Sequence, residues 1–200
     1  MEAKIGKSKR KKVGLFFGSF NPVHIGHMIL ANYMLENTDM EVVWFVVSPQ
    51  NPFKTKSSLL NEIHRYAIVQ RATEEDERIQ VSNIEFSMSK PSYTSDTLVK
   101  LSEKHPEKDF SLIMGQDNLK SLHKWKNVDY LLEEHELFVY PRLGAEKTAW
   151  EAHKKVHLVQ APQVEMSASF IRASIKKGHD IRWMLPEKGW KYIQEMNFYQ

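Results

Sequence analysis

The sequence predicts an α/β fold with a central parallel sheet flanked by helices. Short apolar runs of strand length alternate along the chain with longer segments of helical pattern. Strands that are joined through helices pair in parallel, and such sheets bind ligands beyond the carboxyl ends of their strands. The loops 18–27, 49–54 and 115–117, which carry the most distinctive residues, all follow predicted strands. We therefore expect one site at that edge of the sheet.

Each element is predicted from its apolar pattern and from the residues that bound it. The predicted strands are 13–17, 41–47, 79–81, 109–114, 137–140 and 156–159. The predicted helices, with a small helical part at the C-terminus, are 28–35, 62–75, 92–104, 127–134, 169–177 and 186–196. Asn61, Ser169 and either Ser92 or Thr94 are expected to cap three of these helices, because their side-chain oxygens can accept free N–H groups of the first turn.

Composition narrows the class of protein. A chain of 200 residues can bury a core as one domain. It has no cysteine, which excludes disulfides, thiolate metal sites and cysteine nucleophiles. The net charge of +3 owes much to residues 1–12, which we expect to form a flexible basic tail before a domain at 13–200. No apolar segment follows the tail as in a signal peptide, and no stretch approaches the roughly 20 residues of a membrane span. We expect a cytoplasmic protein without a membrane partner.

The most distinctive segment is GSFNPVHIGH, residues 18–27, between the first predicted strand and the first predicted helix. Backbone N–H groups and the positive end of the dipole at a helix start favour a phosphate. Gly18 lets the backbone approach a ligand closely. His24 and His27 lie three residues apart, so they share one face of the first turn. The loop predicts a phosphate site, and the alternative is a tight turn with two solvated histidines.

This GxFxPxHxGH pattern resembles the nucleotide-binding motif of the nucleotidylyltransferase superfamily. Within it, the chain is similar to the bacterial nicotinate mononucleotide adenylyltransferases from residue 13 to about residue 190, which implies a single Rossmann-like nucleotidyltransferase domain. The segment MSASFIR, residues 166–172, resembles the family's ISSTxIR, with Met166, Ala168 and Ser169 as departures. The implied catalytic residues are His24, His27 and Arg172. The implied ATP- and phosphate-binding residues are Gly18, Ser19, Phe20, Asn21, His24, His27, Ser169, Phe170 and Arg172, and Arg142 of a YPR segment can approach ATP.

Four further segments resemble the same family. They are PQNPFK at 49–54, with Phe53 for the usual histidine, SYTSDTL at 92–98, GQD at 115–117, and Trp125. The resemblance implies a mononucleotide site made by Lys54, Tyr93, Thr94, Gly115, Asp117 and Trp125. In it the aspartate contacts ribose hydroxyls and the tryptophan stacks on the pyridine ring. The alternatives are a surface lysine, helix-capping residues and a core tryptophan.

The resemblance implies an adenylyltransferase of NAD biosynthesis that makes nicotinate adenine dinucleotide and pyrophosphate from ATP and nicotinate mononucleotide. The mononucleotide phosphate is mostly dianionic at neutral pH and attacks the α-phosphate directly, so no protein base is needed. Mg²⁺ is expected on the triphosphate, held by phosphate oxygens and water, and no protein metal ligand is predicted.

Other functions stay open at this point. The acceptor can be nicotinamide mononucleotide or phosphopantetheine, and the protein can be a sensor that binds ATP without turnover. The basic tail can bind nucleic acid, with an affinity that falls steeply with salt. The intact histidine pair favours catalysis, and we expect no nucleic-acid partner. The segment 88–90, which resembles part of the KMSKS loop of class I tRNA synthetases, is interpreted as coincidence. A homo-oligomer is left open.

Overall fold

A computed structural model describes residues 10–49 and 59–200. Their strands form one sheet in the order β3-β2-β1-β4-β5-β6, and every neighbouring pair is parallel. The central strand β1 pairs on both sides, so that Leu15 lies opposite Trp44 and Leu112. The strands are β1 (Lys11–Gly18), β2 (Val42–Val47), β3 (Ile79–Ser82), β4 (Lys108–Gly115), β5 (Leu137–Tyr140) and β6 (Val156–Leu158). The predicted parallel sheet is confirmed.

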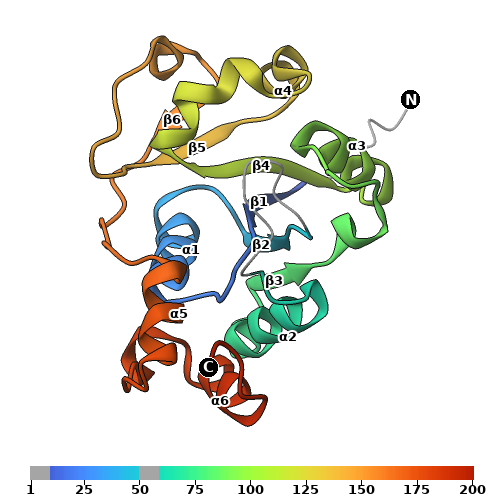
Figure 1. The fold of residues 1–200 in the computed structure, drawn as a ribbon. Helices are drawn as coiled ribbons and strands as arrows, with labels where there is room; N and C mark the ends of the chain where they lie inside the picture. Colours follow the sequence, from blue (N-terminus) through green and yellow to red (C-terminus); the bar gives the residue numbers. More distant parts are fainter. Residues whose placement is uncertain (1–9, 50–58) are drawn as a thin grey trace, which may run out of the picture.

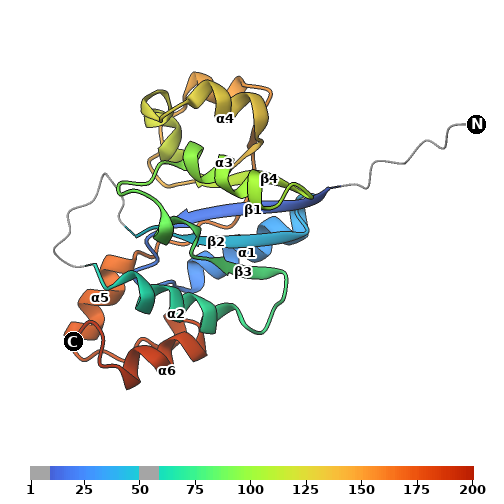
Figure 2. The ribbon, with the colours of Figure 1, turned by 90° about the vertical axis from the view of Figure 1, so that its right-hand side faces the viewer.

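Helices cover both faces of the sheet (Figures 1 and 2). One core contains side chains of α1 (Ile25–Asn37), α2 (Glu62–Thr73), α5 (Ala168–Lys176) and α6 (Glu187–Glu195). The core on the other face contains side chains of α3 (Thr94–Lys104) and α4 (Val128–Glu134). The chain also forms short 3-10 helices that the sequence pattern did not predict: η2 (Ile84–Ser87), η3 (Gln116–Lys124), η4 (Ala149–Ala152) and η5 (Arg182–Met184).

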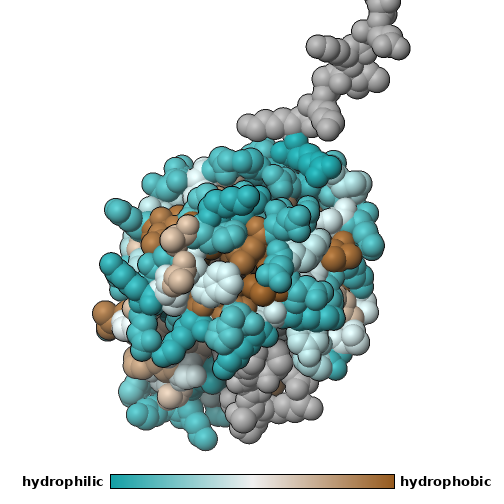
Figure 3. Space-filling view, turned by 90° about the horizontal axis from the view of Figure 1, so that it is seen from above, coloured by the Kyte–Doolittle hydropathy of each residue, from teal (hydrophilic) through white to brown (hydrophobic). Residues whose placement is uncertain are grey.

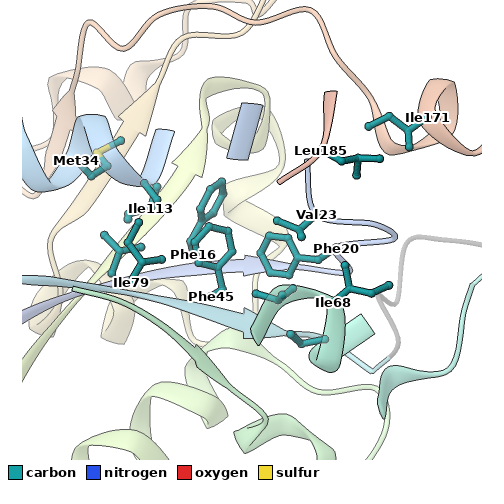
Figure 4. Close-up of a cluster of buried hydrophobic side chains, with 14 of the residues drawn as sticks. Phe16, Phe20, Val23, Met34, Phe45, Ile68, Ile79, Ile113, Ile171 and Leu185 are labelled. Carbon is teal, nitrogen blue, oxygen red and sulfur yellow. The ribbon is translucent and has the colours of Figure 1, made fainter. Parts of the chain in front are cut away.

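The loop after β1 is anchored in the first core by an aromatic side chain (Figure 4). The Phe20 ring is 3% exposed and lies 5.0 Å from Phe45 and 5.9 Å from Phe16, measured between ring centroids. Its backbone has a φ of 41°, a conformation that L side chains rarely adopt. A Cβ atom on Gly18 would lie 2.8 Å from this ring. Glycine at position 18 therefore makes room for Phe20, a use that the sequence analysis did not foresee.

Two of the predicted helix caps are wrong. Helix α5 is capped by Ser167, whose extended backbone lets its Oγ accept from the Phe170 N–H at 3.1 Å, whereas Ser169 already lies inside the helix. Helix α3 begins after Tyr93 and has no side-chain cap, because the Ser92 hydroxyl donates to Glu85 instead. The cap at Asn61 is confirmed, since its side chain accepts from the Ile63 N–H.

The surface in Figure 3 is mostly hydrophilic, with small separate hydrophobic patches between polar side chains. Within residues 10–49 and 59–200, none of the helices has the length and apolar character needed to cross a bilayer.

The largest fully buried side chain is an arginine in α2. Arg65 is 0% exposed and donates to backbone carbonyls of two loops, the one between β1 and α1 and the one between β2 and α2. It binds Leu60 at 2.8 Å, Ser48 at 2.8 Å and Pro49 at 3.0 Å, and it also binds the carbonyl of Ser19. The loops that follow β1 and β2 are thus held together by one guanidinium.

Replacing Arg65 with methionine is expected to lower the free energy of unfolding by about 3 kcal/mol or more, because the buried stem stays while four carbonyls lose their donor. Urea unfolding measures the change. Arg78→Met is the control, since its side chain is 49% exposed and makes surface ion pairs. We expect that variant to lose no more than about 1 kcal/mol. Equal losses in the two variants would contradict the role of Arg65.

Candidate active site

Two cavities lie at the carboxyl edge of the sheet, one on each side of it. The α1 cavity, of about 410 Å³, is lined by the starts of α1 and α5, the loop after β5 and residues 162–166. The α3 cavity, of about 370 Å³, is lined by the ends of β1 and β4, the start of α3 and the segment around Trp125. Tyr140, at the end of β5, lines both cavities. The site therefore consists of two cavities that meet at Tyr140.

The predicted histidine pair forms one wall of the α1 cavity. His24 is the N-cap of α1, and its ring centroid lies 3.7 Å from that of His27. The backbone N–H of His24 donates to Nδ1 of His27 at 3.2 Å. Because that nitrogen accepts, Nε2 carries the proton in the neutral His27 ring. Both rings thus lie at the start of a helix, where backbone N–H groups and the dipole favour an anion.

Burial determines the charge of His24, whose exposed fraction is 6%. Loss of solvation, and then the positive charge of Arg142, lower the pKa of His24 to about 4. The ring is therefore neutral at pH 7. Its Nδ1 is buried and has no hydrogen-bond partner among the described residues. A Cβ atom on Gly26 would lie 3.1 Å from this nitrogen, so glycine at 26 lets the ring lie against the helix start.

The start of α5 contributes Ser167 and Phe170 to the α1 cavity. Further along this helix, Arg172 turns back as predicted, and its guanidinium donates to Ser169 Oγ at 3.2 Å. It also donates to the backbone carbonyl of Asn21 at 2.7 Å. The motif near the end of the chain is thereby joined to the loop after β1, which lies about 150 residues earlier.

Arg142 and Asp117 meet over Gly115, between the two cavities. Arg142 Nε lies 3.8 Å from Asp117 Oδ1. A Cβ atom on Gly115 would lie 2.4 Å from that oxygen and 3.1 Å from Arg142, so only glycine leaves room for both side chains. Both are well exposed, at 46% and 61%, so the ion pair is weak and either group can turn to a ligand. Arg142 lines the α1 cavity and Gly115 lines the α3 cavity, whereas Asp117 lines neither of these two.

The α3 cavity has aromatic and cationic walls, with a buried carboxylate, Glu85, among them. Tyr93, Thr94 and Trp125 line it, as do Lys124 and Lys126. Lys126 Nζ lies 5.1 Å from the centre of the Tyr93 ring and pairs with Asp96 at 2.8 Å. Trp125 packs against the second core and also lines the cavity, so its place in the core leaves it within reach of a ligand there. Such walls suit a flat aromatic ring that carries negative charge.

The structure brings most of the predicted site residues to one edge, on the two sides of Tyr140. Gly18, Tyr93, Thr94, Gly115 and Trp125 line the α3 cavity. His24, His27, Arg142 and Phe170 line the α1 cavity. Ser19, Phe20 and Asn21 form the loop between the cavities and line neither of these two. Lys54 lies outside the described residues.

Asn21 has structural partners that the sequence analysis did not anticipate. Its Oδ1 accepts from the Tyr199 hydroxyl at 2.8 Å and from the Leu60 N–H at 3.2 Å. The side chain is 4% exposed. The end of the chain is thus fastened to the loop after β1.

Sequence reasoning also missed Arg65, Glu85 and Tyr140. For Arg65 a signal existed, because it precedes Ile68, Val69 and Ala72 by three, four and seven residues and so shares the apolar face of α2. For Tyr140 the signal was its place at the end of a predicted strand, in the YPR segment. We find no comparable signal for Glu85, whose partners are Thr97 of α3 and Ser92 just before that helix.

Comparison with known proteins gives concordant results. A model of the cytidylyltransferase-like family matches residues 15–174. A probable nicotinate-nucleotide adenylyltransferase of Christiangramia forsetii is 53% identical over 192 residues, which are 95% of this chain and 99% of the relative. Its counterpart in Flavobacterium johnsoniae is 50% identical over 191 residues, with 94% and 99% covered.

A solved structure supports the fold. The nicotinic acid mononucleotide adenylyltransferase of Plasmodium falciparum, complexed with NaAD, superposes with a TM-score of 0.78 over 94% of this chain and 97% of its own, at 21% identity. The family expected from the motifs is confirmed. The chain belongs to the nicotinate-nucleotide adenylyltransferase family of cytidylyltransferase-like proteins.

Proposed function

We propose that this protein transfers AMP from ATP to nicotinate mononucleotide, which yields nicotinate adenine dinucleotide and pyrophosphate. The observation that carries the proposal is the pair of cavities that meet at Tyr140. A reaction between two nucleotides needs two adjoining sites with a phosphate-binding element beside their junction. Relatives that are 40–53% identical carry the name of this activity.

ATP is assigned to the α1 cavity, which offers the helix start, the histidine pair and Arg142 for phosphates. Phe170 is 52% exposed at this cavity, so its ring can stack on the adenine. Ser169 and Arg172 are assigned to the leaving pyrophosphate. The mononucleotide is assigned to the α3 cavity, with its pyridine ring near Trp125 and its ribose near Asp117.

Catalysis then rests on positioning and charge rather than on a protein base. The mononucleotide phosphate attacks the α-phosphate, and the bond to the leaving pyrophosphate breaks. Neutral His24 and His27 donate hydrogen bonds to the phosphate oxygens, while the arginines supply positive charge. The donors are held in place by the start of α1 before substrate arrives, so little reorganisation is needed during the reaction.

The remaining assignments are part of the same proposal. Mg²⁺ enters with the triphosphate and is held by its oxygens and by water, in keeping with its preference for phosphate ligands. Residues 13–200 form the catalytic domain after a basic tail, and the protein works in the cytoplasm. The number of subunits is left open.

Pyrophosphate release tests this function. With ATP and Mg²⁺, we expect much faster release with nicotinate mononucleotide than with nicotinamide mononucleotide at equal concentration. Lys124 and Lys126 line the α3 cavity, while both oxygens of Glu85, the one carboxylate among the described residues that line it, are engaged by hydroxyl groups. Equal or reversed rates would leave the chemistry standing but contradict the assigned acceptor. No release with either acceptor would contradict catalysis and favour a nucleotide-binding protein.

Replacing His24 with alanine is expected to lower kcat by about 10²–10³-fold, the usual cost of one donor to a transition-state oxygen. The fold should persist, which circular dichroism can check. His179→Ala is a matched control, because that histidine is exposed near the far end of α5. Near-normal turnover in the His24 variant would contradict its assignment.

His24 should also make stability depend on pH. Its pKa in the folded protein, about 4, lies below the usual histidine value of 6.5. The unfolded chain therefore takes up a proton first as the pH falls, and stability should drop by about 2 kcal/mol between pH 7 and pH 5. Urea unfolding of His24→Asn should lack this part of the drop. The same drop in both proteins would contradict a buried neutral His24, because other buried histidines such as His135 contribute equally to both.

A further inference from the structure

A buried carboxylate lies in the wall of the α3 cavity. Glu85, in η2, is 2% exposed and lines this cavity. One of its oxygens accepts from the Ser92 hydroxyl at 2.8 Å, and the other accepts from the Thr97 hydroxyl at 2.8 Å. Both carboxylate oxygens are thus engaged by hydroxyl groups of a single short segment.

The two hydroxyls flank the start of α3. Ser92 precedes the N-cap residue Tyr93, and Thr97 lies in the first turns of the helix, where its N–H donates to the Tyr93 carbonyl at 3.1 Å. Tyr93 itself makes no side-chain cap. A helix start without a local cap needs other contacts to define its geometry. The contacts through Glu85 supply them, from a separate helix.

The same segment provides two walls of the α3 cavity, Tyr93 and Thr94. Hydrogen bonds to a carboxylate are short and directional, and they are stronger than those between neutral groups. A carboxylate that holds the residues before and after Tyr93 therefore restricts where these walls can lie. The neighbouring ion pairs, Lys90 with Glu62 and Lys126 with Asp96, are partly exposed and restrict them less than the buried Glu85 does.

We propose that Glu85 is a positioning residue of the acceptor site, which fixes Tyr93 and Thr94 against the pyridine mononucleotide through Ser92 and Thr97. The inference rests on the proposed function. It gives a role to the first serine and to the second threonine of SYTSDTL, which the assignment of substrates leaves unused. Because Glu85 does not line the α1 cavity, its effect is confined to the acceptor.

Glu85→Gln is the direct test. The amide keeps the shape of the side chain, but its nitrogen cannot accept, so one hydroxyl loses its acceptor. The KM for nicotinate mononucleotide should rise about tenfold, which corresponds to about 1.4 kcal/mol. The KM for ATP and kcat at saturating acceptor should stay within about twofold, the scatter we allow for independent sites. Equal rises in both KM values, or none in either, would overturn the proposal.

Glu103→Gln is the matched control, because it removes the same charge from an exposed position of α3, the helix that Glu85 contacts through Thr97. It should leave both KM values unchanged. A rise in the acceptor KM of this variant would mean that overall charge, and not the contacts of Glu85, controls acceptor binding.

The path through the hydroxyl can be tested with Thr97→Val. If Glu85 acts through Thr97, the effects of Glu85→Gln and Thr97→Val on the acceptor KM should be less than multiplicative in the double variant. Fully multiplicative effects would overturn the proposed path. If Glu85→Gln does not fold, Ser92→Ala removes only one of the two contacts and should still raise the acceptor KM selectively. No change there would count against the proposal.

Calorimetric titration with nicotinate mononucleotide alone separates this inference from the proposed function. Wild-type protein that binds the mononucleotide but releases no pyrophosphate would refute the function, while a tenfold weaker Kd in Glu85→Gln would still support the positioning role. An unchanged Kd in an active enzyme would refute the positioning role alone. Absence of binding to the wild type would refute both.

Discussion

The geometry of the active edge depends on a single buried guanidinium. Arg65 donates to backbone carbonyls rather than to a carboxylate, and these carbonyls belong to the loop after β1, the loop after β2 and the residue before the N-cap of α2. Burial lowers its pKa, yet an arginine remains charged at neutral pH. It therefore does two things at once. Together with the hydrogen bond from the Leu60 N–H to Asn21, it fixes the relative position of the loops after β1 and β2, and it places a positive charge behind the proposed phosphate site.

The order of the strands explains why two cavities meet there. The chain runs outward from β1 to β3 with α1 and α2 on one face, and then returns through α3 to β4 on the other side of β1. The connections at β1 and β4 thus leave toward opposite faces, which opens a crevice at the carboxyl ends of these strands. The α1 cavity lies on the first face and the α3 cavity on the second. A fold with this switch brings two ligands together end to end, as transfer of a nucleotidyl group requires.

Much of this arrangement could be predicted from the sequence, because parallel strands buried on both faces leave continuous apolar runs. The strand at 137–140 was predicted with its observed bounds. The cap at Asn61 was predicted because it was the one residue there that fitted the N-cap preference for a short polar side chain. At the start of α5 two serines fitted the same preference, and only the backbone conformation distinguishes Ser167 from Ser169. The motifs identified the site residues by type, but not their partners. Arg65 and Ser19 are 46 residues apart, and Tyr199 and Asn21 are 178 apart. No local pattern encodes such contacts.

The lowered pKa of His24 indicates that hydrogen bonding and positive charge come from different residues of the α1 cavity. A cation at this position would attract a triphosphate, but desolvation keeps the ring neutral at physiological pH. In the proposed reaction its contribution is therefore a hydrogen bond of fixed direction, and the charge must come from elsewhere. Arg142, Arg172 and the start of α1 can supply that charge, with Arg65 behind them. Separating charge from hydrogen bonding has a physical advantage, because arginines keep their charge whatever the pH. A neutral His24 ring that is already held against the helix start loses little freedom when the phosphate binds. This arrangement also accounts for Gly26, the residue that lets the His24 ring lie in that position.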